Sequence, residues 1–316
     1  MDPLPDAVLF EPVTMRDWTC RNRVVMPPMV TVRDPVSPQG VAWYERRAAG
    51  GVGLVIVEAV GCPRFGADIT VGPLRQLAEA VHRHGALIAV QLFPTRIGAS
   101  QDVNACSEAG LAAICDQYRV AARLCLEAGI DGVEPHGAHG YLLNRAFSPT
   151  QNRRTDRYGG SPANRMRLAL DIVRAVRDAV GPRLLLLYRH TPVQKDAYGL
   201  EESLDLAREL VASGVDVLDL SPSSLEAPGD LAAPFMGLGA RVIAVGSLDE
   251  PGRATEAVTA VRADLVAIGR GLIADPDWPR KVAAGDWSQV VRCVKCNEKC
   301  FGNLKRGIPI ECAQWN

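Results

Sequence analysis

Residues 52–58 read VGLVIVE, a short run made almost entirely of aliphatic and β-branched residues. Such a run is typical of a strand that is covered on both faces, as parallel strands are when helices pack against them. Seven more runs of this kind occur along the chain, at 23–27, 87–92, 132–136, 184–189, 215–221, 242–246 and 265–269. The sequence therefore predicts eight buried strands.

Amphipathic helical patterns lie between these runs. One of them, with apolar residues three and four positions apart, consists of Leu74, Leu77, Ala78 and Val81. Two more span 166–180 and 204–211. The repeated strand-then-helix order favours an α/β fold in which eight units close into a (β/α)8 TIM barrel, with an open doubly wound sheet as the alternative. We assign residues 1–285 to the barrel and residues 286–316 to a short C-terminal cysteine-rich segment.

The composition narrows the class of protein. The 316 residues are 47% hydrophobic and 22% charged, which is enough apolar chain to bury a full-sized core and excludes a disordered protein. The 35 basic and 36 acidic residues leave a formal net charge of -1, so a nucleic-acid or membrane-surface partner has no electrostatic support. Neither a run of about 18 apolar residues nor a signal-peptide pattern occurs. We expect a cytoplasmic protein that acts on a small molecule.

The last two predicted strands each end in a glycine-containing turn. In a (β/α)8 barrel the reactive groups lie where strands end and the following loops begin. The residues of the two turns are Gly246, Ser247, Gly269 and Arg270. Glycine lets backbone amides approach an anion, and arginine adds a charge-assisted hydrogen bond. These turns predict a phosphate site for a cofactor or substrate; the alternative is a pair of ordinary turns with a solvated arginine.

The fourth predicted strand ends in EPHGAHGY, which places His136, His139 and Tyr141 within six residues. Two imidazoles in this position can donate hydrogen bonds to one oxygen while the phenol delivers a proton. The alternatives are that the two histidines hold a metal ion or that they are hydrogen-bonded core residues.

Two more polar residues end predicted strands. Arg189 ends the fifth strand, where a buried guanidinium needs a negatively charged partner, either a ligand or an acidic side chain inside the barrel. Gln91 lies near the end of the third strand, and its amide is suited to reading the edge of a ring or to closing a loop.

Four of the nine cysteines crowd the end of the chain in the pattern C-x2-C-x3-C-x11-C: Cys293, Cys296, Cys300 and Cys312. In a reducing compartment such crowding favours a metal site over disulfides. Three closely spaced thiolates and one distant thiolate favour an iron-sulfur cluster over zinc, whose sites more often pair cysteines at both ends.

Several longer stretches resemble a known family. They are NRVVMPPM at 22–29, WYERRAAGGVGLVIVEA at 43–59, DGVEPHGAHGYLLNRAFSPTQNRRTDRYGGSPANRMR at 131–167 and ADLVAIGRGLIADPD at 263–277. In this order they resemble the Old Yellow Enzyme family of FMN-dependent oxidoreductases. The cysteine pattern is similar to that of the iron-sulfur branch, which includes 2,4-dienoyl-CoA reductase and trimethylamine dehydrogenase.

The resemblance implies a role for each candidate residue. Pro28 and Met29 would lie against the flavin, Ala59 near its ring, Gln91 at its pyrimidine edge and Arg189 beside N1. The FMN phosphate would be held by Gly246, Ser247, Gly269 and Arg270. His136 and His139 would bind a substrate carbonyl oxygen, Tyr141 would donate a proton, and the four clustered cysteines would bind a 4Fe-4S cluster.

The implied reaction is hydride transfer from FMN to an activated carbon–carbon double bond, as in an ene-reductase. The alternatives are a dehydrogenase or desaturase that runs in the reverse direction and a non-catalytic electron-transfer subunit. Because multidomain members of the branch continue into a second flavin domain, we expect either that a separate flavin reductase or ferredoxin-type protein exchanges electrons with this chain or that the chain is a fragment. Direct reduction by NAD(P)H is a further alternative.

Overall fold

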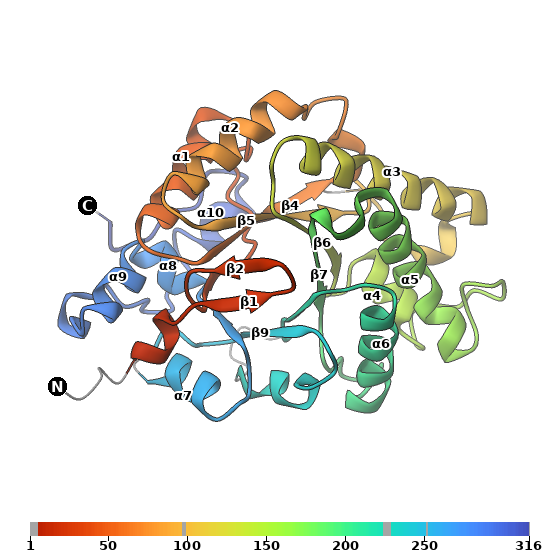
Figure 1. The fold of residues 1–316 in the computed structure, drawn as a ribbon. Helices are drawn as coiled ribbons and strands as arrows, with labels where there is room; N and C mark the ends of the chain where they lie inside the picture. The colour runs from red at the N-terminus through yellow and green to blue at the C-terminus, as the bar shows by residue number, and fades with distance from the viewer. Residues whose placement is uncertain (1–5, 97–98, 224–228, 251, 316) are drawn as a thin grey trace.

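The computed structural model of the protein describes residues 6–96, 99–223, 229–250 and 252–315. Eight parallel strands close into a barrel in the order β10-β3-β4-β5-β6-β7-β8-β9, with helices around it (Figure 1). The strands are β3 (Val24–Met26), β4 (Leu54–Gly61), β5 (Leu87–Phe93), β6 (Gly132–Gly137), β7 (Leu185–His190), β8 (Val217–Leu220), β9 (Arg241–Val245) and β10 (Leu265–Ala267). Each predicted run overlaps one of them, so the (β/α)8 barrel is confirmed and the doubly wound alternative is wrong.

The helices lie outside the barrel and at its carboxyl end. They are α1 (Pro38–Ala49), α2 (Val71–His82), α3 (Glu108–Glu127), α4 (Leu142–Phe147), α5 (Pro162–Val180), α6 (Leu200–Ala212), α7 (Arg253–Thr259), α8 (Arg270–Ala274), α9 (Trp278–Ala283) and α10 (Phe301–Lys305). Short 3-10 turns occur at Ala7–Phe10, Cys62–Arg64, Val103–Ala105, Gly181–Arg183, Gly229–Phe235 and Trp287–Gln289. Ser37, Ser107 and Ser161 cap α1, α3 and α5, because each side chain accepts a hydrogen bond from the backbone three residues on. Within the described ranges, no helix has both the length and the apolar character needed to span a membrane.

Side chains alternate between the inside and the outside of the closed barrel. On β4, Leu54 and Ile56 belong to the inner apolar cluster, whereas Val55 and Val57 pack with the residues of the surrounding helices. Both faces of the strand are therefore buried. This two-sided burial is the reason why the strand sequences lack polar alternation.

A two-stranded antiparallel hairpin, which the strand pattern does not predict, closes one end of the barrel (Figure 1). It consists of β1 (Val13–Met15) and β2 (Trp18–Cys20). Its buried residues Val13, Met15 and Cys20 pack against the inner cluster. Arg16 in its turn pairs at 3.0 Å with Asp216, which immediately precedes β8. The hairpin thus lies at the amino-terminal end of the strands and leaves their carboxyl ends free for a site.

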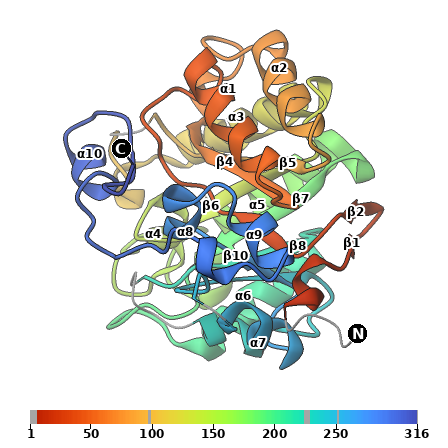
Figure 2. The same ribbon diagram turned by 90° about the vertical axis from the view of Figure 1, so that its left-hand side faces the viewer.

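The segment after α9 lies at the opposite end. Figure 2 shows α10 and the C-terminus on the other side of the barrel from the β1–β2 hairpin. The backbone N–H of Ile310 donates to the carbonyl of Thr31 at 3.1 Å, and Arg33 Nη2 donates to the carbonyl of Ile310 at 2.8 Å. These bonds fasten the C-terminal segment to the loop that follows β3.

The hairpin predicts a clear difference between neighbouring substitutions. Met15 is fully buried against the barrel interior, so Met15→Ala should lower the free energy of unfolding by about 2–5 kcal/mol through lost burial and a new cavity. Thr14 is exposed in the same strand, so Thr14→Ala should change it by less than about 0.5 kcal/mol. Chemical denaturation of both variants tests this; equal effects would show that the hairpin does not seal the barrel.

Candidate active site

The twelve residues that the sequence analysis assigned to cofactor and substrate line a single cavity at the carboxyl end of the barrel. The cavity has a volume of about 660 Å³. The twelve residues are Pro28, Met29, Ala59, Gln91, His136, His139, Tyr141, Arg189, Gly246, Ser247, Gly269 and Arg270. They come from the ends of seven strands and the loops that follow, as strand closure into a barrel requires.

Other residues of the cavity wall were not predicted. Gln101 and Ser221 are polar members of this group, and the C-terminal segment contributes Cys300, Phe301, Leu304 and Ile310. Ser221 could have been predicted as a site residue, because it ends the predicted strand at 215–221. The C-terminal residues gave no such signal, because their approach to the barrel depends on the path of an irregular segment.

The rings of His136, His139 and Tyr141 converge in this cavity. The ring centroid of His136 lies 5.2 Å from that of His139 and 5.1 Å from that of Tyr141. Phe93 packs edge-on against Tyr141 with centroids 4.9 Å apart. Two imidazoles and a phenol therefore face one small region, as the sequence analysis expected.

The loop that carries His139 is held in a tight turn. His139 has a φ of 60°, in the left-handed region, and its N–H donates to Thr191 Oγ1 at 3.1 Å. The following Gly140 N–H donates to Asn144 Oδ1 at 2.8 Å. Such strain in a residue other than glycine persists where surrounding contacts fix it, and it is frequent at functional sites.

Burial keeps both histidines neutral. Desolvation lowers the pKa of His136 well below its ordinary value of 6.5, and the repulsion that a protonated His136 would meet from His139 and Arg189 lowers it further. Desolvation and then Arg189 lower the pKa of His139 to about 3. A neutral imidazole has one N–H donor and one acceptor nitrogen. Each ring can thus donate one hydrogen bond to a substrate oxygen without carrying a charge.

Ser221 connects Arg189 to His139. Its Oγ accepts a hydrogen bond from Arg189 Nη2 at 2.9 Å and lies 2.9 Å from His139 Nε2. Because the guanidinium can only donate, the hydroxyl proton of Ser221 is available to His139 Nε2. This arrangement favours the tautomer of neutral His139 that has its proton on Nδ1. The Nδ1 of His136 accepts from the Ala138 N–H at 3.2 Å, which assigns its proton to Nε2.

A layer of polar side chains lies in the barrel interior next to these groups. One residue from each of β5, β6, β7 and β8 forms this layer: Gln91, Glu134, Arg189 and Asp219. Gln91 Nε2 donates to Glu134 Oε1 and Arg189 Nη1 donates to Asp219 Oδ2, both at 2.7 Å. The sequence analysis left an acidic partner for Arg189 open, and the structure identifies it as Asp219. It did not predict Glu134 or Asp219 as members of the site.

The predicted phosphate residues lie at the β9 and β10 ends of the same cavity. Ser247 has a φ of 48° and Gly246 a φ of 135°, so the turn presents its backbone in a conformation that most side chains disfavour. Arg270 begins α8, and its Nη1 donates to Asn297 Oδ1 at 3.3 Å. Asp249 also lines the cavity, and burial raises the pKa of its carboxyl.

The four clustered cysteines line a second, smaller cavity beside Arg270. Backbone N–H groups of Lys295 and Gln314 donate to the sulfurs of Cys293 and Cys312, each at 3.4 Å. Cys300 lines both cavities. Among the described residues, no three His, Cys, Asp or Glu side chains are grouped to hold a metal ion. The iron-sulfur cluster therefore stays a prediction.

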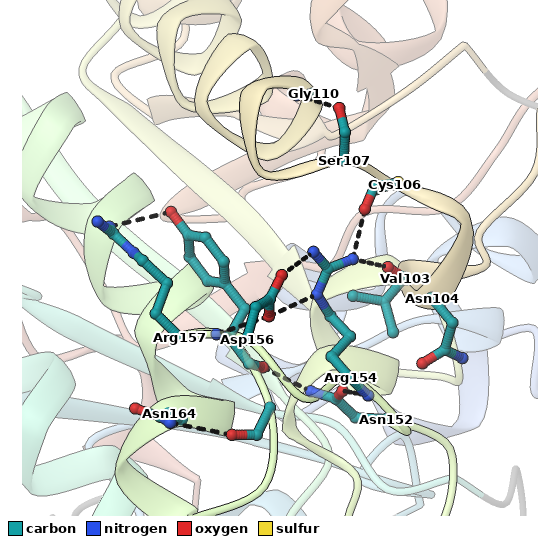
Figure 3. A network of polar contacts seen from close by, with 12 residues as sticks. Val103, Asn104, Cys106, Ser107, Gly110, Asn152, Arg154, Asp156, Arg157 and Asn164 are labelled. Carbon is teal, nitrogen blue, oxygen red and sulfur yellow. Dashed lines mark hydrogen bonds and ion pairs between the residues drawn. The ribbon is translucent and has the colours of Figure 1, made fainter.

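Arg154 contacts the 103–106 segment, which follows Gln101 in the chain (Figure 3). Arg154 donates to the carbonyl oxygens of Val103 and Cys106 and pairs with Asp156. Its guanidinium is almost fully buried. The polar residues of the 152–156 stretch thus position loops around the site rather than lining it.

Comparisons with known proteins agree with this fold. A family model described as the NADH:flavin oxidoreductase / NADH oxidase family matches residues 8–113, 103–224 and 236–288. An NADH oxidase of Thermoanaerobacter brockii is 34% identical over 347 aligned positions, which cover 93% of this chain and 53% of the relative. An NADPH dehydrogenase of Geobacillus sp. (strain WCH70) is 32% identical over 320 positions, covering 88% of this chain and 94% of the relative.

Solved structures share the barrel. The complex of 2-naphthoyl-CoA reductase with 2-naphthoyl-CoA has a TM-score of 0.88 at 23% identity, covering 96% of this chain and 56% of that one, and this likeness supports the fold alone. The chain also spans about half the length of the NADH oxidase.

The family match includes the barrel strands whose carboxyl ends form the cavity. The chain belongs to the NADH:flavin oxidoreductase / NADH oxidase family. This membership confirms the resemblance to the Old Yellow Enzyme family.

The site predicts how its histidines titrate. His136 and His139 should show no protonation step between pH 8 and pH 5, because the pKa of His136 is well below 6.5 and that of His139 is about 3. His82 is the internal control, since its hydrogen bond to Asp131 raises its pKa above 6.5 and it should titrate above that pH. NMR of the ring C–H signals, assigned with His136→Asn and His139→Asn, measures this. A step near pH 6.5 in either site signal would contradict the neutral pair.

Proposed function

We propose that the protein is an ene-reductase that reduces the double bond of an α,β-unsaturated carbonyl compound or thioester. The observation that carries this proposal is the convergence of two neutral imidazoles and one phenol in the cavity. Donors of this kind stabilise negative charge that develops on a carbonyl oxygen. A cationic amine substrate would gain less from them, which favours reduction over the reverse amine dehydrogenase reaction.

The cavity fits FMN as a flat, anionic cofactor. Its walls contain Pro28, Met29 and Ala59, which offer apolar contact to a ring. Arg189 Nε is buried and has no hydrogen-bond partner in the described part of the chain, and Gln91 lines the cavity beside it. We assign Gln91 and Arg189 to the pyrimidine side of the flavin. We assign the phosphate to Gly246, Ser247, Gly269 and Arg270. When bound, FMN supplies the hydride.

The protein side chains would act on the substrate. His136 and His139 would donate their N–H groups to the carbonyl oxygen and stabilise the developing enolate, while Tyr141 would deliver a proton to the α-carbon. Tyr141 is 40% exposed, so its hydroxyl can be resupplied with a proton from solvent. Arg189 and Ser221 would hold His139 in the tautomer with a proton on Nδ1.

The electron source is part of the proposal. The similarity to an NADPH dehydrogenase, of which the chain covers 94%, supports NAD(P)H as a direct donor. We also propose that residues after about 285 form a cluster-binding segment in which Cys293, Cys296, Cys300 and Cys312 hold a 4Fe-4S cluster. The shared cavity and the N–H groups that donate to two of the sulfurs support this. Such a cluster would exchange electrons with a separate flavin reductase or ferredoxin-type protein.

Loss of one oxygen-binding imidazole should slow hydride transfer to a bound enone. We expect His136→Ala to reduce the rate by about 10²–10³-fold, as for a lost oxyanion donor, with the FMN content unchanged. His84→Ala, on the far side of the barrel beside Glu45, is the matched control and should keep the wild-type rate. The measurement is anaerobic reoxidation of the reduced protein by enones and, for the oxidised protein, reduction by amines. A full rate in His136→Ala would favour a non-catalytic electron-transfer protein, and reduction by amines alone would favour the reverse reaction.

If the four cysteines hold a cluster, the purified protein should contain iron whether or not flavin is bound. An anaerobic preparation should contain about four iron and four sulfide per chain, and Cys300→Ser should lose both. Cys106→Ser is the control, because Cys106 lies near Arg154 and away from the cysteine cavity, and it should keep full iron. Iron and sulfide analysis with visible spectroscopy decides this. Zinc in place of iron, or iron retained in Cys300→Ser, would contradict the cluster.

A further inference from the structure

The polar layer across the barrel contains two fully buried carboxyl groups. Glu134 and Asp219 are both 0% exposed. One oxygen of each is accounted for, since Glu134 Oε1 accepts from Gln91 and Asp219 Oδ2 accepts from Arg189. The other two, Glu134 Oε2 and Asp219 Oδ1, have no donor elsewhere in the described part of the chain. Each carboxyl group lies close enough to the other to perturb its pKa.

Two buried carboxyl oxygens that lack any other donor can satisfy each other only if one of them carries a proton. Two buried carboxylates in contact would repel each other strongly, so only one of them is ionised. Asp219 has the guanidinium of Arg189 at 2.7 Å, whereas Glu134 has only the neutral amide of Gln91. The ionised member is therefore Asp219. In agreement, burial raises the pKa of Glu134 well above its ordinary value, and the neighbouring charge of Asp219 raises it further.

We propose that Glu134 and Asp219 share one proton, held on Glu134, and that this pair positions Gln91 and Arg189 and sets the charge beneath the flavin. The proposal rests on the proposed placement of FMN against these two residues. Neutral Glu134, anionic Asp219 and cationic Arg189 leave the layer with no net charge. Both carboxyl residues act through Gln91 and Arg189 and are positioning residues.

The net charge of the layer should control the reduction of the flavin. A reduced flavin carries more negative charge than an oxidised one, so a positive charge left unbalanced beside it stabilises the reduced form. Removing the Asp219 carboxylate leaves Arg189 unbalanced. Replacing a neutral Glu134 by glutamine changes no charge, and the amide can still donate to Asp219 and accept from Gln91.

The isosteric variants Asp219→Asn and Glu134→Gln test this in the full-length holoprotein. The midpoint potential of bound FMN is measured by an anaerobic visible titration. Asp219→Asn should shift it to more positive values, equivalent to about a tenfold or greater gain in preference for the reduced flavin. Glu134→Gln should leave it unchanged. Asp216→Asn is the control, because Asp216 also pairs with an arginine, Arg177, but at the other end of the barrel.

A second readout tests the positioning role. Glu134→Leu removes the acceptor of Gln91 and should weaken FMN binding by about tenfold, whereas Glu134→Gln should restore wild-type affinity. A positive potential shift in Glu134→Gln with none in Asp219→Asn would place the proton on Asp219 and overturn the assignment. Unchanged midpoint potentials in both variants would contradict the proposed effect of the layer's charge on the flavin. Wild-type protein that binds no FMN would instead refute the proposed cofactor site.

Discussion

Arg189 carries a positive charge inside the barrel, at 5% exposure, where an unpaired ion would cost several kcal/mol. Its neutralisation explains most of the polar groups around it. Asp219 on the neighbouring strand balances the charge, and Ser221 at the end of that strand accepts a second N–H. Ser221 then orients His139. The site is thus a set of hydrogen bonds that starts at one guanidinium and ends at the groups facing the cavity.

Much of this arrangement could be predicted from the sequence, for a physical reason. Closure of parallel strands sends every carboxyl end to the same side, so residues at strand ends such as His136 and Arg189 meet without knowledge of the register. Glu134 and Asp219 lie within strands. Which interior residues share a layer depends on the register between neighbours, such as Arg189 opposite Asp219, and one sequence does not specify this.

The hairpin at the other end could not be predicted for a different reason. Each of its strands has three residues, and Arg16 takes a positive φ in a turn that contains neither glycine nor asparagine. No turn signal marks it. The polar residues of the 152–156 stretch show a related limit. They form part of the motif that resembles the family, yet Arg154 contacts backbone carbonyls behind the loop and not the cavity.

The C-terminal segment forms one wall of the larger cavity and, together with Arg270 and Ile273, the wall of the cysteine cavity. Cys300 belongs to both, and Leu304 and Ile310 close the first. The segment is attached to the barrel by a few contacts, among them Ile310 to Thr31 and Trp315 to the carbonyl of Ala274. Chemical damage to the cysteines would therefore also disturb the wall of the larger cavity. The larger cavity can thus lose its shape through this outer wall while every barrel residue remains intact.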